Sequence, residues 1–343
     1  MMKLSRRRLL ATVGSAAAMA AVGGRAFAQD KLGSAEWNYD VVIGGGSATG
    51  NSRILASAIG KIITENVEGV RASGAVVPGY DAESAMHVHD GTMIGGVGTP
   101  LIIENATKGV APFPSEGIDL RLWFYHNELP LNILGRTDTG FTRISELKGA
   151  TVALAPKGTS NYLFTQIVFE ANGVSLDDVT VRYMDTSKAI DQLQNGNIDA
   201  LSYVRDFSGA VLELTGSRDV TLLQPSEESI PKIKERIEWA GPVDWPFKEQ
   251  YPDLKVPDPG QTFVSPEFMF LKADLPEDLV YAMTRAVWEN VSEIQRSTNV
   301  YAKVNLQEAL KRVPIPPHAG ALRYYKEQNV PGWEKYQDLL SDG

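Results

Sequence analysis

The sequence contains no cysteine among its 343 residues. This absence excludes disulfide bonds, thiolate metal ligands and a cysteine nucleophile, so packing must hold the fold together. Histidine is also scarce, with four in the chain. His87 and His89 have a spacing seen in metal sites, but they would share a face only on a strand, and no third nitrogen ligand lies nearby. We therefore expect neither a metal nor a cofactor.

The apolar run at residues 9–24 is too short, and too rich in glycine and alanine, to span about 30 Å of hydrocarbon. It follows Arg6 and Arg7 and precedes Ala26-Phe27-Ala28, which has the small-x-small pattern of a cleavage site. These features predict a twin-arginine signal peptide over residues 1–28, cleaved after Ala28, and an exported, periplasmic protein. No cysteine follows the cleavage site, so a lipid anchor on the mature end is excluded.

Positive charge is in short supply. The whole chain has 33 Lys and Arg against 42 Asp and Glu, a net charge of −9. Removal of residues 1–28 takes away five basic residues and no acidic one, which leaves 28 against 42, a net charge of −14. Nucleic-acid binding needs clustered Lys and Arg on the surface, so we expect no nucleic-acid partner.

Two strand–loop–helix units are visible in the remaining, roughly 315-residue chain, a length that suits two domains of ordinary size. The first has a strand at residues 39–43, a glycine loop at 44–50, a helix through residue 63 and a strand at 70–77. The second has a strand at residues 151–154, a loop at 155–161 and a helix ended by Gly173. Alternation of this kind predicts an α/β fold with right-handed crossovers.

Further elements follow the second unit. We expect strands at residues 179–184 and 198–203, a short helix capped by Asp185, and a proline-rich connector over residues 239–266. A strand at residues 268–271 then precedes a helix with Asp274 as its cap and Pro276 near its first position.

The first glycine loop invites comparison with a dinucleotide fingerprint, in which a pyrophosphate rests on a helix N-terminus. With Gly44 and Gly46 as the first two glycines, the third should fall at position 49, which is Thr49. The acid expected at the end of the second strand is also missing. An exported flavin- or nicotinamide-dependent oxidoreductase therefore remains the alternative function.

The same loop supports a simpler function. Exposed amides at a helix start attract an anion by about 0.3–1 kcal/mol, and by up to about 2 kcal/mol when partly buried. Ser47, Thr49 and Asn51 add side-chain donors, and residues 157–161 (KGTSN) offer the same arrangement in the second unit. We expect the two loops to face each other as a clamp for a small anion; the alternative is that these side chains only cap helices.

The chain resembles the TAXI group of solute receptors, which serve TRAP-type secondary transporters. The resemblance spans nearly all of residues 29–343. The matching stretches are IGGGSATG at residues 43–50, ISELKG at 144–149, APKGTS at 155–160, NGNIDA at 195–200 and, most specifically, IPPHAGALRYYKE at 315–327. In this last stretch we interpret His318 as a packing or hydrogen-bonding residue and the two tyrosines that follow as anchors of the C-terminal helix.

The resemblance implies a type II periplasmic binding protein fold, with lobe I at residues 29–138 plus 263–343 and lobe II at 139–262. It implies a monomeric, non-enzymatic receptor that captures a small organic anion, such as a glutamate-like amino acid, a dicarboxylate or an oxo-acid, and delivers it to a TRAP-type membrane permease. The binding residues that it implies, together with those of the predicted clamp, are Gly46, Ser47, Ala48, Thr49, Asn51, Tyr80, Asp81, Thr99, Gly158, Thr159, Ser160, Asn161 and Tyr203.

Two departures from the family pattern lie where the ligand should bind. Asn51-Ser52 stand where aromatic residues are usual, and residues 203–207 (YVRDF) replace a glycine-proline pattern. Arg205 would either bind a carboxylate of the ligand in a bidentate manner or form a salt bridge with a neighbouring acid. The aromatic residues at 123–126 alternate along an expected strand, and either pack in the core or present one face to the cleft.

Overall fold

The computed structural model describes residues 32–46, 50–204, 208–237, 239–257, 259–312 and 314–340. The predicted signal peptide lies outside these residues. Within them, no helix has both the length and the apolar character needed to cross a membrane.

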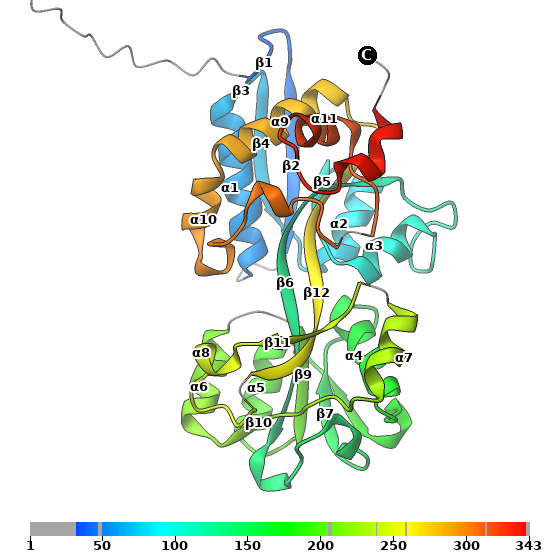
Figure 1. The fold of residues 1–343 in the computed structure, drawn as a ribbon, viewed down its shortest axis with the longest axis vertical. Coiled ribbons are helices and arrows are strands. Elements are labelled where there is room, and N and C mark those ends of the chain that lie inside the picture. The colour runs from blue at the N-terminus through cyan, green and yellow to red at the C-terminus, as the bar shows by residue number, and fades with distance from the viewer. Residues whose placement is uncertain are drawn as a thin grey trace, which may run out of the picture. The chain divides into compact units, whose positions relative to one another are not determined.

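Strands and helices alternate through most of the chain (Figure 1). The strands are β1 (Leu32–Gly33), β2 (Tyr39–Gly46), β3 (Val67–Glu68), β4 (Val70–Val76), β5 (Gly95–Gly98), β6 (Leu120–Arg136), β7 (Thr151–Leu154), β8 (Thr180–Tyr183), β9 (Ala200–Val204), β10 (Val220–Leu222), β11 (Pro242–Trp245) and β12 (Gly260–Lys272). The α-helices are α1 (Asn51–Asn66), α2 (Tyr80–His89), α3 (Pro100–Thr107), α4 (Ser160–Ala171), α5 (Thr186–Gln194), α6 (Gly209–Ser217), α7 (Ser229–Arg236), α8 (Phe247–Gln250), α9 (Glu277–Glu289), α10 (Val291–Ser297) and α11 (Ala319–Glu327). Short 3₁₀ helices are η1 (Thr137–Thr139), η2 (Ile144–Glu146), η3 (Leu176–Asp178), η4 (Asn299–Tyr301), η5 (Leu306–Glu308) and η6 (Trp333–Leu339).

Two long strands, β6 and β12, run antiparallel and connect two lobes (Figure 1). In lobe I the strand order is β4-β2-β5-β12-β6, and in lobe II it is β6-β9-β7-β8, with β10 on β6 and β11 on β12. Pro130 pairs with Val264 near the point of passage, and Ile133 already pairs with Ser202 of lobe II. Leu131 packs in a core cluster of lobe II. Strand β6 therefore enters lobe II a few residues before the lobe limit predicted at residue 138. The lobe limits themselves stay a prediction.

The sheet of lobe I is covered on both faces. Helices α1, α9 and α11 pack on one face, and α2 and α3 on the other (Figure 1). Side chains of β12 alternate between the two cores, with Met269 on the α1 side and Phe268 on the α3 side. Close approach of α1 to β4 depends on Gly74, because a Cβ there would lie 2.5 Å from the Ser57 nitrogen.

The sheet of lobe II is covered in the same way. Helices α4 and α7 bury one face, where Val152 and Phe164 meet, and α5, α6 and α8 bury the other, where Leu201 and Leu193 meet. Burial of each such side chain stabilises the fold by roughly 1.5–3 kcal/mol relative to exposure. The predicted two-lobed α/β architecture is confirmed.

Two local predictions are wrong. The proline-rich segment at residues 239–266 is not only a connector, because it contains β11, α8 and the start of β12; Pro242 is tolerated as the first residue of an edge strand. Asp274 does not cap α9. Pro276 is the N-cap residue, and the Asp274 carboxylate instead lies 2.9 Å from the Lys272 ammonium.

Other local predictions hold. Asp185 caps α5 by accepting a hydrogen bond from the Lys188 amide at 2.9 Å. His318 is buried and accepts a hydrogen bond from the Gly320 amide at the start of α11, and Tyr325 of that helix donates to the Trp123 carbonyl at 2.5 Å. The aromatic residues at 123–126 are all buried. Trp123 and Phe124 pack in the core of lobe I, the His126 ring contacts Phe124 and Tyr301, and the Lys311 ammonium lies over the Tyr125 ring.

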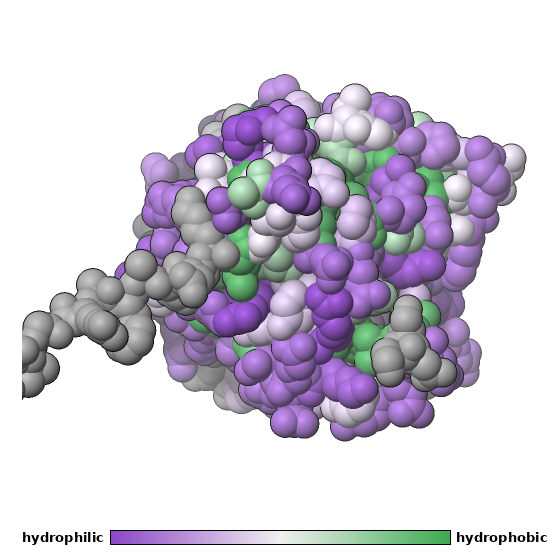
Figure 2. All heavy atoms as spheres, turned by 90° about the horizontal axis from the view of Figure 1, so that it is seen from above, coloured by the Kyte–Doolittle hydropathy of each residue, from purple (hydrophilic) through white to green (hydrophobic). Residues whose placement is uncertain are grey.

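The surface at the end of the molecule that carries α9 and α11 is mainly hydrophilic, with apolar residues in small separate areas (Figure 2). Scattered apolar residues of this kind are ordinary on protein surfaces.

Candidate ligand-binding site

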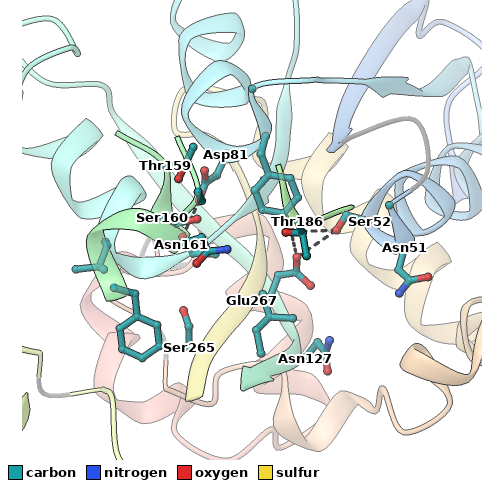
Figure 3. Close-up of a pocket in the computed structure, with 18 of the residues that line it drawn as sticks. Asn51, Ser52, Asp81, Asn127, Thr159, Ser160, Asn161, Thr186, Ser265 and Glu267 are labelled. Atoms are coloured by element: carbon teal, nitrogen blue, oxygen red, sulfur yellow. Dashed lines mark hydrogen bonds between the residues drawn. The ribbon is translucent and has the colours of Figure 1, made fainter. Parts of the chain in front are cut away.

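A cavity of about 250 Å³ lies between the two lobes, beside the passage of β6 and β12 (Figure 3). Most of its lining comes from helix starts in both lobes. The lining residues are Gly50, Asn51, Ser52, Pro78, Gly79, Tyr80, Asp81, Thr99, Leu101, Asn127, Leu129, Ala155, Thr159, Ser160, Asn161, Phe164, Thr186, Ser265, Glu267, Val300 and Tyr301. A cleft that joins polar helix ends and apolar walls is the usual form of a small-molecule site.

Five helices begin at this cavity: α1, α2 and α3 from lobe I, and α4 and α5 from lobe II. The first amides of a helix have no partner within it and carry partial positive charge. At the start of α4, the Thr159 hydroxyl accepts a hydrogen bond from the Tyr162 amide at 3.3 Å. Ser160 and Asn161, the next two residues, line the cavity, and as first-turn residues their backbone amides have no partner within the helix.

A buried carboxylate, Glu267 of β12, faces the helix starts of lobe I. It is 2% exposed. Its Oε1 accepts a hydrogen bond from the Ser52 hydroxyl at 3.1 Å and another, short one from the Tyr80 hydroxyl (Figure 3). Burial raises the pKa of Glu267 to about 7, and the hydrogen bond from Ser52 works weakly against that rise.

His126 of β6 lies beside Glu267, and its Nδ1 is 3.7 Å from Oε2 of the carboxylate. The ring is 5% exposed, and neither ring nitrogen has a hydrogen-bond partner within the described residues. Burial lowers the pKa of His126 to about 3, so the imidazole is neutral near pH 7. His126 therefore gives Glu267 no positive counter-charge.

Asp81 is the second buried acid that lines the cavity. Its carboxylate is satisfied locally, since the Thr99 hydroxyl donates to Oδ2 at 2.6 Å and the Ala82 amide donates to Oδ1 at 3.0 Å. Burial raises the pKa of Asp81 to about 6, against the effect of these hydrogen bonds. Its place in the first turn of α2 favours the ionised form through the helix dipole.

Tyr80 has a backbone conformation that few residues other than glycine adopt, with φ at 59°. Its amide donates to the Val77 carbonyl at 3.0 Å, and its ring packs against Gly46, where a Cβ would lie 2.7 Å from two ring carbons. Strained residues of this kind gather at binding sites, where the surrounding structure holds them in place. From this backbone conformation the Tyr80 hydroxyl donates to Glu267.

The structure brings half of the predicted binding residues together around the cavity. Those that line it are Asn51, Tyr80, Asp81, Thr99, Thr159, Ser160 and Asn161. Gly46, Gly158 and Tyr203 do not line it: Gly46 lies under the Tyr80 ring, and Tyr203 is buried in the core of lobe II between the sheet and its helices. Ser47, Ala48, Thr49 and Arg205 lie outside the described residues. A role of the lining residues in binding remains a proposal.

Several lining residues were not foreseen. They include Asn127, Leu129, Ser265 and Glu267 from the passage between the lobes, Phe164 and Thr186 from lobe II, and Val300 and Tyr301 from η4. One signal in the sequence could have found Glu267: it is the one acid of β12 and directly precedes the apolar run at residues 268–271. An acid in such a strand is rarely buried without a partner or a function.

Among solved structures, the putative sulfonate ABC transporter, periplasmic sulfonate-binding protein SsuA from Methylobacillus flagellatus KT is 13% identical, covering 86% of this chain and 96% of that chain at a TM-score of 0.52. MatC from Rhodopseudomonas palustris with bound malate is 16% identical, and the match covers 87% of this chain and 98% of that chain at a TM-score of 0.49. The alkanesulfonate-binding protein SsuA from Xanthomonas axonopodis pv. citri bound to MOPS is 14% identical, and the match covers 88% of this chain and 84% of that chain at a TM-score of 0.45.

At these identities the Methylobacillus structure shows a shared fold, that of a periplasmic binding protein. The predicted fold is therefore confirmed. The narrower assignment to TAXI receptors is not shown by these comparisons. A model of the NMT1-like family matches residues 43–328, most of the chain and all of the cavity lining, and the protein thus belongs to the NMT1-like family.

Proposed function

We propose that this protein is a periplasmic solute receptor, not an enzyme, which captures a small organic anion between its two lobes and delivers it to a membrane transporter. The observation that carries the proposal is the cavity itself, where helix starts of both lobes meet at the only two long strands of the described chain that pass between them. A solute held by both lobes stabilises one lobe arrangement, which a membrane partner then recognises.

The anionic character of the solute rests on the starts of α4 and α5. Both helices direct their first turns at the cavity, through residues 159–161 and Thr186. Backbone amides at such positions bind carboxylates, sulfonates and phosphates alike. We propose that the solute is a glutamate-like amino acid, a dicarboxylate or an oxo-acid, and these classes should be tested first.

The alternative, an oxidoreductase that uses the first glycine loop, has less support. In a dinucleotide site the second glycine leaves room for a pyrophosphate. Here the space beside Gly46 is filled by the Tyr80 ring. A purified protein that is colourless and free of nucleotide would agree with the receptor function.

The partner is proposed to be a TRAP-type permease, on the resemblance of residues 315–327 to TAXI receptors. The Methylobacillus protein is instead described as the binding protein of a putative sulfonate ABC transporter. Uptake of a labelled solute by cells that make the receptor separates the two. A protonophore should stop uptake through a TRAP permease, whereas ATP depletion with the ion gradient maintained should stop uptake through an ABC transporter.

The receptor function is tested by thermal unfolding of the purified protein with amino acids, dicarboxylates, oxo-acids and sulfonates. A solute at a hundredfold excess over its Kd stabilises the folded state by about 2.7 kcal/mol. We expect a large and selective rise in Tm with one chemical class. A flat response to all of these classes would contradict the organic-anion receptor.

A further inference from the structure

Glu267 is a buried carboxylate without a counter-charge. No Lys or Arg is found among the described residues that line the cavity, and Oε2 of Glu267 lies 3.7 Å from Nδ1 of the neutral His126 ring. An isolated charge out of water is costly, and proteins relieve that cost by a proton, an opposite charge or a ligand. Glu267 is therefore either protonated or paired with something that enters the cavity.

The two oxygens of Glu267 are not equivalent. Oε1 already accepts hydrogen bonds from Ser52 and Tyr80, whereas Oε2 accepts none within the described part of the chain. Asn127, opposite Glu267 in the β6–β12 pair, also lines the cavity, and its Nδ2 has no hydrogen-bond partner among the described residues. An acceptor and an amide are thus unused at the same place, which points to a missing ligand group.

The two sides of the cavity differ in charge. Both acids of the described lining, Glu267 and Asp81, belong to lobe I, beside the starts of α1, α2 and α3, whereas lobe II contributes the starts of α4 and α5 and no acid. Asp81 is satisfied by Thr99 and Ala82 and has less to offer a ligand. A solute with a positive end at Glu267 and a negative end at α4 fits this arrangement.

We propose that Glu267 forms an ammonium subsite, with Asn127 and Ser265 beside it, so that the receptor selects solutes bearing a protonated primary amine together with an acidic group. This inference rests on the proposed receptor function and narrows its solute class. A bound metal ion is a weaker fit, because the described residues contain no group of three or more His, Asp or Glu side chains able to hold one. An ammonium needs fewer acceptors, and its N–H donors match the open Oε2 of Glu267; the unused Nδ2 of Asn127 is itself a donor and would bind an acceptor oxygen of the acidic group of the solute.

Matched pairs of solutes test the subsite: L-glutamate with 2-oxoglutarate, L-alanine with pyruvate, L-leucine with 4-methyl-2-oxopentanoate and L-phenylalanine with phenylpyruvate. Each pair shares one carbon skeleton and differs only in an ammonium or an oxo group. Calorimetric titration at about pH 8 keeps Glu267 ionised. In the pair that binds, we expect the amine to bind at least about tenfold more tightly than its oxo partner.

Glu267→Gln keeps the shape of the side chain and removes its charge. It should weaken binding of the amine by about 10- to 100-fold and leave the oxo partner unchanged or tighter, so that the preference disappears. Glu128→Gln is the matched control, since Glu128 pairs with Lys311 and Arg312 outside the cavity lining; it should keep the preference. The wild-type preference is informative even if the Glu267 variant does not fold.

Three results would overturn the inference. Tighter binding of the oxo partner by wild type, or an amine preference that survives Glu267→Gln, would reject the subsite while the receptor function stands. Failure of all eight acids to bind, together with a flat thermal response to dicarboxylates and sulfonates, would reject the proposed solute class, and with it the inference that rests on it.

Discussion

The hydroxyl of Ser52, in the first turn of α1, donates a hydrogen bond of 3.1 Å to the carboxylate of Glu267, 215 residues further along the chain. The contact joins a helix start of lobe I to one of the two strands that pass between the lobes. Tyr80, from the start of α2, donates to the same oxygen and lies 3.0 Å from the Ser52 hydroxyl. Any movement of β12 relative to α1 and α2 must change this cluster.

Glu267 should make stability depend on pH in a characteristic way. Its pKa is about 7 in the folded protein against 4.5 for an ordinary glutamate, so between these values the folded state holds a proton that the unfolded state has lost. The free energy of unfolding contributed by this group is therefore highest below about pH 4.5, falls as pH rises, and levels off above about pH 7. Asp81, with a pKa of about 6 against 3.8, acts in the same direction.

Glu267→Gln isolates that contribution. Because glutamine does not titrate, the variant should gain stability relative to wild type as pH rises from about 4.5 to about 7, by an amount on the order of 3 kcal/mol. Urea unfolding at several pH values measures the difference. A constant difference across this range would show that the pKa of Glu267 is not raised.

Tyr80→Phe removes one donor to Glu267 and keeps the ring against Gly46. Loss of a hydrogen bond to the ionised form should raise the pKa of Glu267 further, because the carboxylate loses a group that favours it. NMR titration of the glutamate side-chain carbon reports that pKa directly. Ser52→Ala, which removes the other donor, should move it in the same direction, and a fall in either variant would contradict the arrangement.

Gly46→Ala should destabilise the protein, since the added Cβ would lie 2.7 Å from two carbons of the Tyr80 ring. Overpacking of this kind typically costs about 1–3 kcal/mol. In a double-mutant cycle with Tyr80→Ala, the penalty of Gly46→Ala should be much smaller, because the clash is gone. Equal penalties in the two backgrounds would place the effect in the backbone of β2 instead.

Thr159→Ala should lower the free energy of unfolding by about 1 kcal/mol, because the side chain caps α4 through the Tyr162 amide. Thr159→Ser keeps the hydroxyl and serves as the matched control. Denaturant unfolding measures both. If the hydroxyl also contacts the solute, Thr159→Ala will weaken binding beyond what the serine variant does, and calorimetry separates this effect from stability.

Local elements were largely predictable from sequence. Thr151–Leu154 is a strand with the predicted limits, and α4 begins after Thr159 and ends before Gly173, whose φ of 75° suits a glycine after a helix. These features depend on neighbouring residues: apolar spacing, caps and glycine. For the same reason the sequence indicated that helix starts at residues 51 and 160 belong to a binding cleft.

The face of the sheet on which a strand side chain lies was not predictable in the same way. Tyr203 was placed in the cleft by resemblance, yet its side chain is buried among α5, α6 and α8, whereas the adjacent Ser202 points to α4 and shares a hydrogen bond of 2.7 Å with Thr165. Neighbouring residues of a strand face opposite sides, and which side meets the cavity depends on the helices that cover the sheet.

The sequence by itself therefore determined the alternation of strands and helices and the starts of α1, α4 and α5, because each is encoded within a few turns of chain. The two-lobed fold was implied by the resemblance, and the helices α2 and α3, whose starts also line the cavity, were not predicted. Only the tertiary structure decided that Glu267 meets Ser52, Tyr80 and His126. That meeting requires β12 to lie between β5 and β6 and α1 to pack against the same sheet. Residues so far apart in the sequence come together because the whole fold buries its apolar surface. Local sequence patterns do not specify which of these distant elements will pair.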